Sequence, residues 1–257
     1  LGLGTLGEIL VYEELSKTNA CFRSRIGTNN GIGSMGILFD GTEEQKRRYL
    51  PRIASGEWTA CFALSEPEAG SDAANVQTTA ERHGSYFIIN GLKHFITNAD
   101  VADVATVIEL IFDNCRVPVD NVIGGEPMIG QGFKTAMRVL DKGRLTMGAC
   151  ALGASQKLLD LCISYSKERV QFGKPICKHQ SVQNMLADMA TEIYAARQML
   201  YHAAWLRDQG KKVIKEASMV KLFCTEMACR VADKAVQIFG RDTASCDCQG
   251  THKGVGD

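Results

Sequence analysis

Two long segments near the end of the chain carry a helical repeat of apolar residues, and these segments constrain the fold most strongly. Residues 181–208 form one apolar helical face and stop at Gly210, and residues 213–239 do the same before Gly240. Long amphipathic helices with a short connection predict antiparallel packing in a bundle. The two faces consist of Val182, Met185, Met189, Ile193, Ala196, Leu200 and Ala203, and of Ala217, Val220, Cys224, Ala228, Val231, Ala235 and Ile238.

Helical periodicity also occupies the start and the middle of the chain. Residues 3–56 are expected to be helical, with a short helix that starts after Thr42 and is interrupted at Pro51. Residues 132–143 and 146–169 predict two further helices ahead of the C-terminal pair.

The helical period gives way between residues 58 and 119 to short strand-like runs. Asn90-Gly91 lies between two such runs and is a hairpin signal, because both residues tolerate a positive φ. The predicted fold class is therefore α+β, with an N-terminal helical region, a short antiparallel β domain and a C-terminal antiparallel helix bundle. The expected strands are 59–64, 76–82, 86–90, 92–97, 101–108 and 109–117.

The same patterns divide the chain into domains. We expect a partial N-terminal helical domain over 1–57, a shortened middle β domain over 58–130, a helix bundle over 131–240 and an irregular tail over 241–257. The tail is polar, rich in Gly and Cys and without periodicity, which is typical of coil or disorder.

The charge balance limits the partners. The sequence has 29 Lys+Arg and 29 Asp+Glu, so its formal net charge of zero argues against general binding to nucleic acid or to an anionic membrane, although a local basic patch stays open. No run approaches the roughly 18 apolar residues that a membrane helix needs. The chain begins in mid-pattern at Leu1, and we expect that residues ahead of it, with any targeting segment, have been lost.

The cysteines indicate a reducing compartment rather than a disulfide framework. Most of the ten lie inside apolar runs, and Cys-x-x-Cys does not occur. Cys246-Asp-Cys248 with His252 is the nearest approach to a zinc motif, but it has no second metal-type pair. We expect no metal site.

The stretch FALSEPEAGSD, residues 62–72, runs from an apolar strand into a polar turn. Gly70 allows close approach of a ligand, and Ser65 and Ser71 offer hydroxyl groups. These features suit the polar edge of a flat heterocycle, while a solvated loop between strands is the alternative.

A second stretch, HFITN, places a ring and a hydroxyl group close together. Phe95 and Thr97 alternate with Ile96, so a strand here would put the first two on one side. A stacking aromatic beside a hydroxyl donor suits the same heterocycle, and a Phe in a sheet core is the alternative.

Two further stretches carry charge at helix positions. In KERVQFGKPICKHQ, Arg169 could bind a phosphate, and Gly173 and Pro175 predict a sharp connection; a basic helix end that complements its dipole is the alternative. In LDKGRL, Asp141 and Arg144 are three residues apart and share a helix face, for which a simple ion pair is the alternative.

The order of these motifs resembles the acyl-CoA dehydrogenase family. The segments AxSEPxAGSD, KxFITN, FDNCRVP, GFKxAMxxLDxGR, ERxQFGKPIxxHQ and VQIFG follow one another from near the start of the chain to Gly240. The resemblance implies a helical domain, a middle β domain and a four-helix bundle, with FAD between the β domain and the bundle. It also implies α,β-desaturation of an acyl-CoA thioester, in which a glutamate removes the α proton and the β hydrogen leaves as hydride.

The resemblance implies site residues as well. Phe95 takes the place of a flavin-stacking Trp, and Ser71 would contact both cofactor and substrate. The expected substrate-binding residues are Ser71, Asp141, Lys142, Gly143 and Arg144. The expected FAD-binding residues are Phe62, Leu64, Ser65, Gly70, Ser71, Phe95, Ile96, Thr97, Arg169, Gln171, Phe172, His179, Gln180, Gln237 and Gly240.

Three departures from the family pattern stand out. Ile108 runs directly into Glu109, where the family has several more strands, so much of a sheet is expected to be absent. Arg241 occupies a position at which the family has a glycine near the cofactor phosphates. The chain ends before the family's usual catalytic glutamate, and Gly143 occupies the alternative position for that base. The catalytic base is therefore unassigned.

The family resemblance also implies partners and a compartment. We expect an acyl-CoA thioester, an electron-transfer flavoprotein and a homo-oligomer, either a dimer or a tetramer, in fatty acid or branched-chain amino acid catabolism. The expected compartment is the mitochondrial matrix in a eukaryote and the cytoplasm in a bacterium. The alternatives are a non-catalytic binding or assembly variant that oligomerises with intact family members, and an unstable product with exposed sheet edges.

Overall fold

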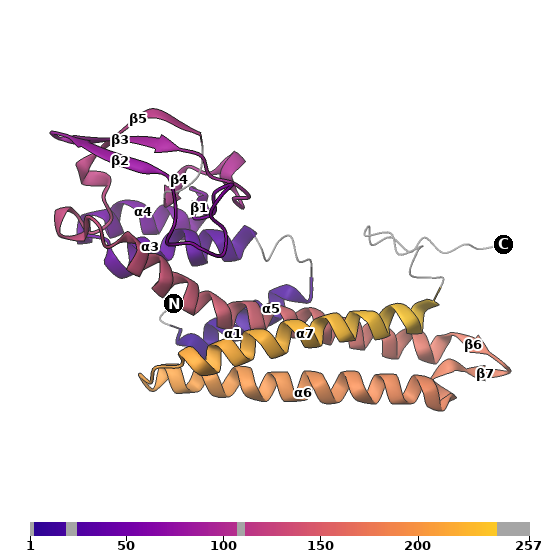
Figure 1. Ribbon diagram of the computed structural model, residues 1–257. Coiled ribbons are helices and arrows are strands. Elements are labelled where there is room, and N and C mark those ends of the chain that lie inside the picture. The colour runs from indigo at the N-terminus through magenta and orange to yellow at the C-terminus, as the bar shows by residue number, and fades with distance from the viewer. Residues whose placement is uncertain (1–2, 19–24, 107–110, 241–257) are drawn as a thin grey trace. The chain divides into compact units, whose positions relative to one another are not determined.

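The computed structural model describes residues 3–18, 25–106 and 111–240, and its contacts divide the chain into two compact units (Figure 1). One unit combines Leu1–Lys17 with Gly148–Asp257, and the other comprises Thr18–Met147. The predicted fold class is confirmed, since helices dominate and small sheets precede a C-terminal helix bundle. The predicted tail, with Cys246 and Cys248, lies outside the described residues.

The first unit is a bundle built on the predicted apolar faces. Five of the seven residues predicted for the α6 face are buried, and six of the seven predicted for the α7 face are buried, while the others are half-buried. The bundle elements are α1 (Thr5–Ser16), the part of α5 (Gly132–Glu168) from Gly148 onward, α6 (Gln180–Asp208) and α7 (Ile214–Phe239).

Contacts at two points along α5 fix the direction of α7. A Cβ added at Gly148 would lie 2.8 Å from Cγ1 of Val220, and the Tyr165 and Phe239 rings pack with centroids 4.7 Å apart. Helices α5 and α7 therefore run parallel, with α6 returning between them in the chain. The segments 132–143 and 146–169, predicted as separate helices, are one continuous helix.

Helix α1 is fixed to the bundle at two points. The Asp208 carboxylate at the end of α6 accepts hydrogen bonds from the backbone N–H groups of Thr5 at 2.6 Å and Leu6 at 3.0 Å. The buried Glu13 accepts from the Tyr201 hydroxyl at 2.7 Å and from Arg197 at 3.1 Å. Burial and the Glu13 carboxylate raise the pKa of Tyr201 to about 12. These contacts set α1 antiparallel to α6.

The second unit begins with helices. In α4 the Thr42 hydroxyl accepts from the Gln45 N–H, while the Gln45 side chain accepts from the Thr42 N–H. The predicted interruption at Pro51 is wrong, because the loss of one donor near the exposed end of the helix does not break it before Ser55. The elements are a π-helical turn (Thr28–Ile32), α3 (Gly33–Asp40) and α4 (Glu43–Ser55).

The strands of this unit form two sheets. One is a parallel pair, β1 with β4, and the other is antiparallel with the order β2–β3–β5. The residues predicted as strand over 101–117 are described only to 106 and from 111. The strands are β1 (Ala60–Phe62), β2 (Thr79–His83), β3 (Tyr86–Gly91), β4 (Val104–Thr106) and β5 (Phe112–Pro118).

The hairpin predicted at Asn90-Gly91 is wrong. The turn between β2 and β3 uses Gly84, at φ 61°, whereas Gly91 is the last residue of β3. A Cβ at Gly91 would overlap the Thr78 side chain, so this glycine serves close packing rather than a turn. The predicted strand 92–97 is wrong for the same region, since the chain leaves the sheet after Gly91.

The second unit contains a partly open cavity of about 810 Å³. Helices α3 and α4, the start of α5 and both sheets line it, mainly with apolar side chains. Ala105 and Val117 line it on the two sides of the 107–110 connection, where the sequence predicts a shortened sheet. In the described part of the chain, none of the helices has an apolar stretch sufficient to span a membrane.

Candidate functional site

The polar turn that follows β1 is closed by its own backbone. The N–H of Glu66 donates to the Ala69 carbonyl at 2.9 Å, and the Ala69 N–H donates to the Glu66 carbonyl at 3.2 Å. Gly70 and Ser71 follow on the surface, and a Cβ at Gly70 would meet no atom of the described residues within 4 Å. The turn therefore presents an open polar edge.

A buried ion pair underlies this turn. Glu66 Oε1 lies 2.5 Å from Lys93 Nζ, and the two side chains are 3% and 0% exposed. Glu66 also accepts from the Thr78 hydroxyl at 2.6 Å and from the backbone N–H groups of Thr78 and Gln77. Burial by itself would raise the pKa of Glu66, but these hydrogen bonds, led by that of Lys93, lower it to about 2. Glu66 is therefore a structural carboxylate.

The second predicted stretch, 94–98, lies directly against the first. The His94 N–H donates to the Ser65 carbonyl at 3.0 Å, and Lys93 Nζ donates to the Leu64 carbonyl at 3.3 Å. The Asn98 side chain reaches the Ala60 carbonyl at 3.2 Å. The two stretches thus form one surface, as the motif order implies.

Phe95 lies on this surface and outside any core. Its side chain is 90% exposed, and its φ of 60° is in the left-handed region. The expected strand alternation of Phe95 with Thr97 is wrong, because neither residue is in a strand. An exposed ring in an uncommon backbone conformation is a ready stacking surface for a planar ligand.

Three hydroxyl groups lie on these two stretches. The Ser65, Ser71 and Thr97 side chains make no hydrogen bond to any residue that the structure describes. Ser65 is half-buried, while Ser71 and Thr97 are exposed. Three available hydroxyls and one exposed ring, on two stretches joined by a backbone hydrogen bond, fit a planar heterocycle with polar edges. Phe62, Leu64 and Ile96 are half-buried next to them.

The predicted substrate segment lies on α5 within the second unit. The ion pair is present, with Arg144 Nη1 2.5 Å from Asp141 Oδ1 and both side chains partly exposed. Lys142 is half-buried. A Cβ at Gly143 would meet only Cγ2 of Ile32 at 3.8 Å, an ordinary van der Waals contact. The position can therefore accommodate a Cβ atom.

The remaining predicted residues gather at one end of the bundle in the first unit (Figure 1). A two-residue turn joins β6 (Val170–Gln171) to β7 (Lys174–Pro175), which confirms the sharp connection. Phe172 at its tip is 93% exposed, with φ 54°. The neighbouring predicted residues are Arg169, Gln171, His179 and Gln180, and Gln237 and Gly240 lie at the end of α7 beside Tyr165.

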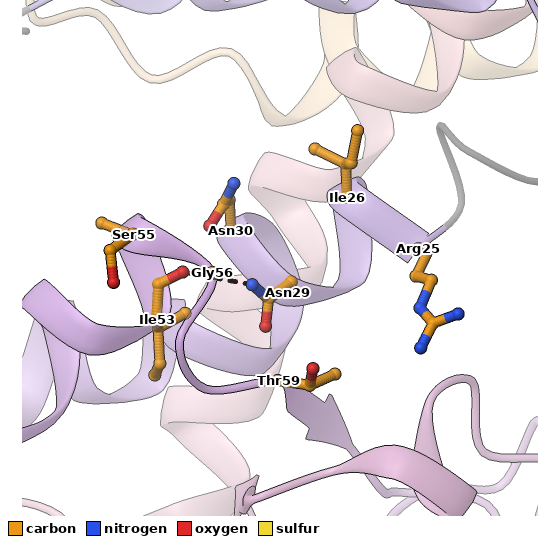
Figure 2. A pocket seen from close by; sticks show the side chains of 9 residues that line it. Arg25, Ile26, Asn29, Asn30, Ile53, Ser55, Gly56 and Thr59 are labelled. Atoms are coloured by element: carbon orange, nitrogen blue, oxygen red, sulfur yellow. Dashed lines mark hydrogen bonds between the residues drawn. The ribbon is translucent and has the colours of Figure 1, made fainter.

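A smaller pocket of about 280 Å³ lies where α4 meets β1 (Figure 2). Figure 2 shows Asn29 pointing toward the Ile53 carbonyl, to which it donates at 3.2 Å. The Asn29 side-chain oxygen accepts from the Ala60 N–H at 2.5 Å. Asn29 therefore connects three elements, with its amide nitrogen and its amide oxygen each bonded to the backbone.

Other reactive groups are structural. Burial raises the pKa of the Cys162 thiol to about 11 and of the Cys224 thiol to about 12, so both are poor nucleophiles. Among the residues described, no three His, Cys, Asp or Glu side chains gather as metal ligands would. Arg241 and the Cys246–Cys248 pair are outside the described residues.

Comparisons with known proteins match most of the chain. The family models "Acyl-CoA dehydrogenase, N-terminal domain", "middle domain" and "C-terminal domain" match residues 1–57, 61–113 and 130–250. An acyl-CoA dehydrogenase of Bacillus subtilis is 37% identical over 280 residues, covering 93% of this chain and 73% of the relative. Since 93% of 257 residues is about 239, roughly 40 aligned positions of the relative have no counterpart here.

Solved structures agree with the sequence relatives. A chain in a structure of the electron transferring flavoprotein of Acidaminococcus fermentans has a TM-score of 0.88 at 40% identity, covering 94% of this chain and 73% of that one. A glutaryl-CoA dehydrogenase of Mycobacterium smegmatis, in complex with FADH2, has a TM-score of 0.88 at 29% identity, covering 94% and 71%. This chain belongs to the acyl-CoA dehydrogenase family.

Proposed function

We propose that this chain binds FAD and carries out flavin-dependent dehydrogenation of an acyl-CoA thioester. The observation that carries the proposal is the junction of the 62–71 and 94–98 stretches, which together carry an exposed Phe95 ring and three available hydroxyls. The M. smegmatis relative in complex with FADH2 supports this assignment.

The chain's residues have distinct proposed roles toward the cofactor. Ser65 and Thr97 donate hydrogen bonds to the polar edge of the flavin, and Phe95 stacks on its ring. The bundle end around Phe172, in a second copy of the chain, binds the phosphate-bearing part through Arg169, Gln171, His179, Gln180, Gln237 and Gly240. FAD, when bound, supplies the hydride acceptor.

The acyl-CoA thioester is assigned to Ser71 and to residues 141–144. Arg144 and Lys142 offer positive charge for the phosphates of coenzyme A, and Asp141 holds Arg144 in place at 2.5 Å. Glu66 is excluded as the base, because a buried carboxylate with four donors and a pKa of about 2 does not accept a proton near neutral pH.

A second candidate function follows from Gly143. At a position where some family members carry the base, this chain has no side chain, and roughly 40 aligned positions are lacking. These observations favour a non-catalytic variant that oligomerises with intact family members and binds rather than turns over acyl-CoA.

The proposal extends to partners and location. We expect an electron-transfer flavoprotein to accept the electrons, supported by the A. fermentans relative. A homo-oligomer is expected because the bundle end would complete a neighbour's cofactor site. The proposed compartment is the mitochondrial matrix in a eukaryote or the cytoplasm in a bacterium.

The test is the visible spectrum of the purified chain with added FAD. Protein-bound flavin absorbance that bleaches with one of a panel of acyl-CoA thioesters supports the dehydrogenase. Protein that stays colourless after FAD addition contradicts it. The second candidate predicts capture of a tagged intact relative on co-expression, with no turnover by the isolated chain, and normal turnover by that chain would exclude it.

A further inference from the structure

The Glu66–Lys93 pair is the most completely buried ion pair among the described residues. The other ion pairs have at least one partner that is more than 20% exposed, whereas these side chains are 3% and 0% exposed. Removing two charges from water is costly, so a buried pair is weak evidence for stability in itself. The presence of this buried pair therefore needs an explanation other than stability, such as holding nearby chain segments in one arrangement.

Each charge holds a different segment. The Glu66 carboxylate accepts from the N–H groups of Gln77 and Thr78, so it fixes the chain that leads into β2. The Lys93 ammonium donates to the Leu64 carbonyl, so it fixes the chain that leaves β1. The pair therefore joins three segments, 62–66, 77–78 and 93–98, which are far apart in sequence.

The joined segments carry the exposed groups of the candidate flavin surface. Ser65 lies between Leu64 and Glu66, which the pair holds on both sides. Phe95 lies two residues after Lys93, and the intervening His94 N–H is bonded to the Ser65 carbonyl. That bond joins two backbone groups, whereas the pair joins two side chains, so the bond reports on the arrangement without being part of the pair.

We propose that Glu66 and Lys93 are positioning residues for the flavin-binding surface: they hold the Ser65 turn and the Phe95 loop as one rigid body. The statement that a flavin binds there rests on the proposed function. The statement that the two loops are held together does not, and it can be tested on the chain without added flavin.

The variants Glu66→Gln and Lys93→Met each leave one buried charge unpaired, and the double variant removes both charges. The matched control is Lys46→Met, which breaks the exposed pair of Lys46 with Glu43 in the same unit. The experiment compares these four variants with the wild type. It measures thermal unfolding, hydrogen exchange of the peptide containing His94, and the FAD dissociation constant.

We expect each single variant to lower the melting temperature by roughly 10 °C, and the double variant to recover most of that loss, since it has no unpaired buried charge. Exchange of the His94 amide rises about tenfold in the single and the double variants alike, because the connection is lost in all three. The FAD dissociation constant rises about tenfold in all three, which corresponds to about 1.4 kcal/mol. The Lys46→Met control changes neither the exchange of the His94 amide nor the FAD dissociation constant.

Two results would overturn the proposal. One is a double variant with His94 exchange at the wild-type rate, because the loops would then be held together without the pair. The other is wild-type FAD affinity in the double variant, which would leave the pair with a role in stability only. A wild-type chain that binds no FAD refutes the proposed function instead, and the exchange experiment still decides whether the pair holds the loops.

Discussion

Gly153 of α5 lies so close to Glu13 of α1 that a Cβ at this glycine would overlap the Glu13 carbonyl oxygen. We predict that Gly153→Ala lowers the free energy of unfolding by about 1–3 kcal/mol, because α1 must move away from α5. This loss exceeds the gain of about 1 kcal/mol that Ala brings to a helix interior. Chemical denaturation measures the change.

Gly143, in the interior of the same helix, provides the control. Its added Cβ would make only an ordinary contact with Ile32, so Gly143→Ala should raise the free energy of unfolding by up to about 1 kcal/mol. Equal effects at the two glycines would contradict the close packing of α1 on α5.

The second prediction concerns acid. The pKa of Glu66 is lowered from 4.5 to about 2 in the folded chain, so its stabilising contribution is complete above about pH 4.5 and is lost as the pH falls toward 2. The shift corresponds to about 3 kcal/mol. We predict that the stability difference between wild type and Glu66→Gln shrinks by about this amount between pH 5 and pH 2, as measured by urea unfolding.

The control for this experiment is Glu43→Gln, which alters an exposed ion pair in the same unit. Its effect should stay within about 1 kcal/mol at every pH. A Glu66→Gln difference that is the same at pH 5 and pH 2 would show that ionised Glu66 does not stabilise the fold.

The third prediction rests on the proposed function. If the isolated chain lacks only its base, Gly143→Glu supplies a carboxylate at a position where an added Cβ makes only an ordinary contact. We predict at least about tenfold faster dye-linked oxidation of acyl-CoA than in the wild type, with a rise only for Glu and not for Gly143→Gln. Equal rates for the two variants would mean that the carboxylate does not reach the substrate.

The fourth prediction concerns the cavity of the second unit. Ala136 is buried and lines this cavity, so Ala136→Leu should fill part of it and raise the free energy of unfolding by about 1 kcal/mol. The matched substitution Ala149→Leu adds the same atoms at a fully buried position in the bundle and should destabilise by about 1–3 kcal/mol. Destabilisation by both would mean that the cavity is already filled.

The helices of the bundle could be predicted from sequence because their signal is local. Met189, Ile193 and Leu200 repeat at helical spacing, and a buried face follows from that spacing alone. The order of the motifs was equally informative, because it is a property of the whole chain rather than of any one segment.

The predictions were wrong where contacts between residues far apart in sequence determine the backbone conformation. The sequence predicted a turn at Gly91, because the close packing of Gly91 against Thr78 cannot be inferred from neighbouring residues. The sequence predicted a strand in the Phe95 loop. Local residues do not show that Lys93 pairs with Glu66, which lies 27 positions earlier. A buried lysine in an apolar run was the one available signal for this pair, since a lysine is seldom buried without a partner.

The bond between Thr5 and Asp208 has a consequence for how the chain is made. The two residues are 203 positions apart, so at about 5–20 residues per second the ribosome delivers Asp208 some 10–40 s after α1 has emerged. Throughout that interval α1 has neither its cap nor the α6 side chains that bond Glu13. The second unit is complete long before, so the nascent chain must keep α1 without these partners until α6 has been translated.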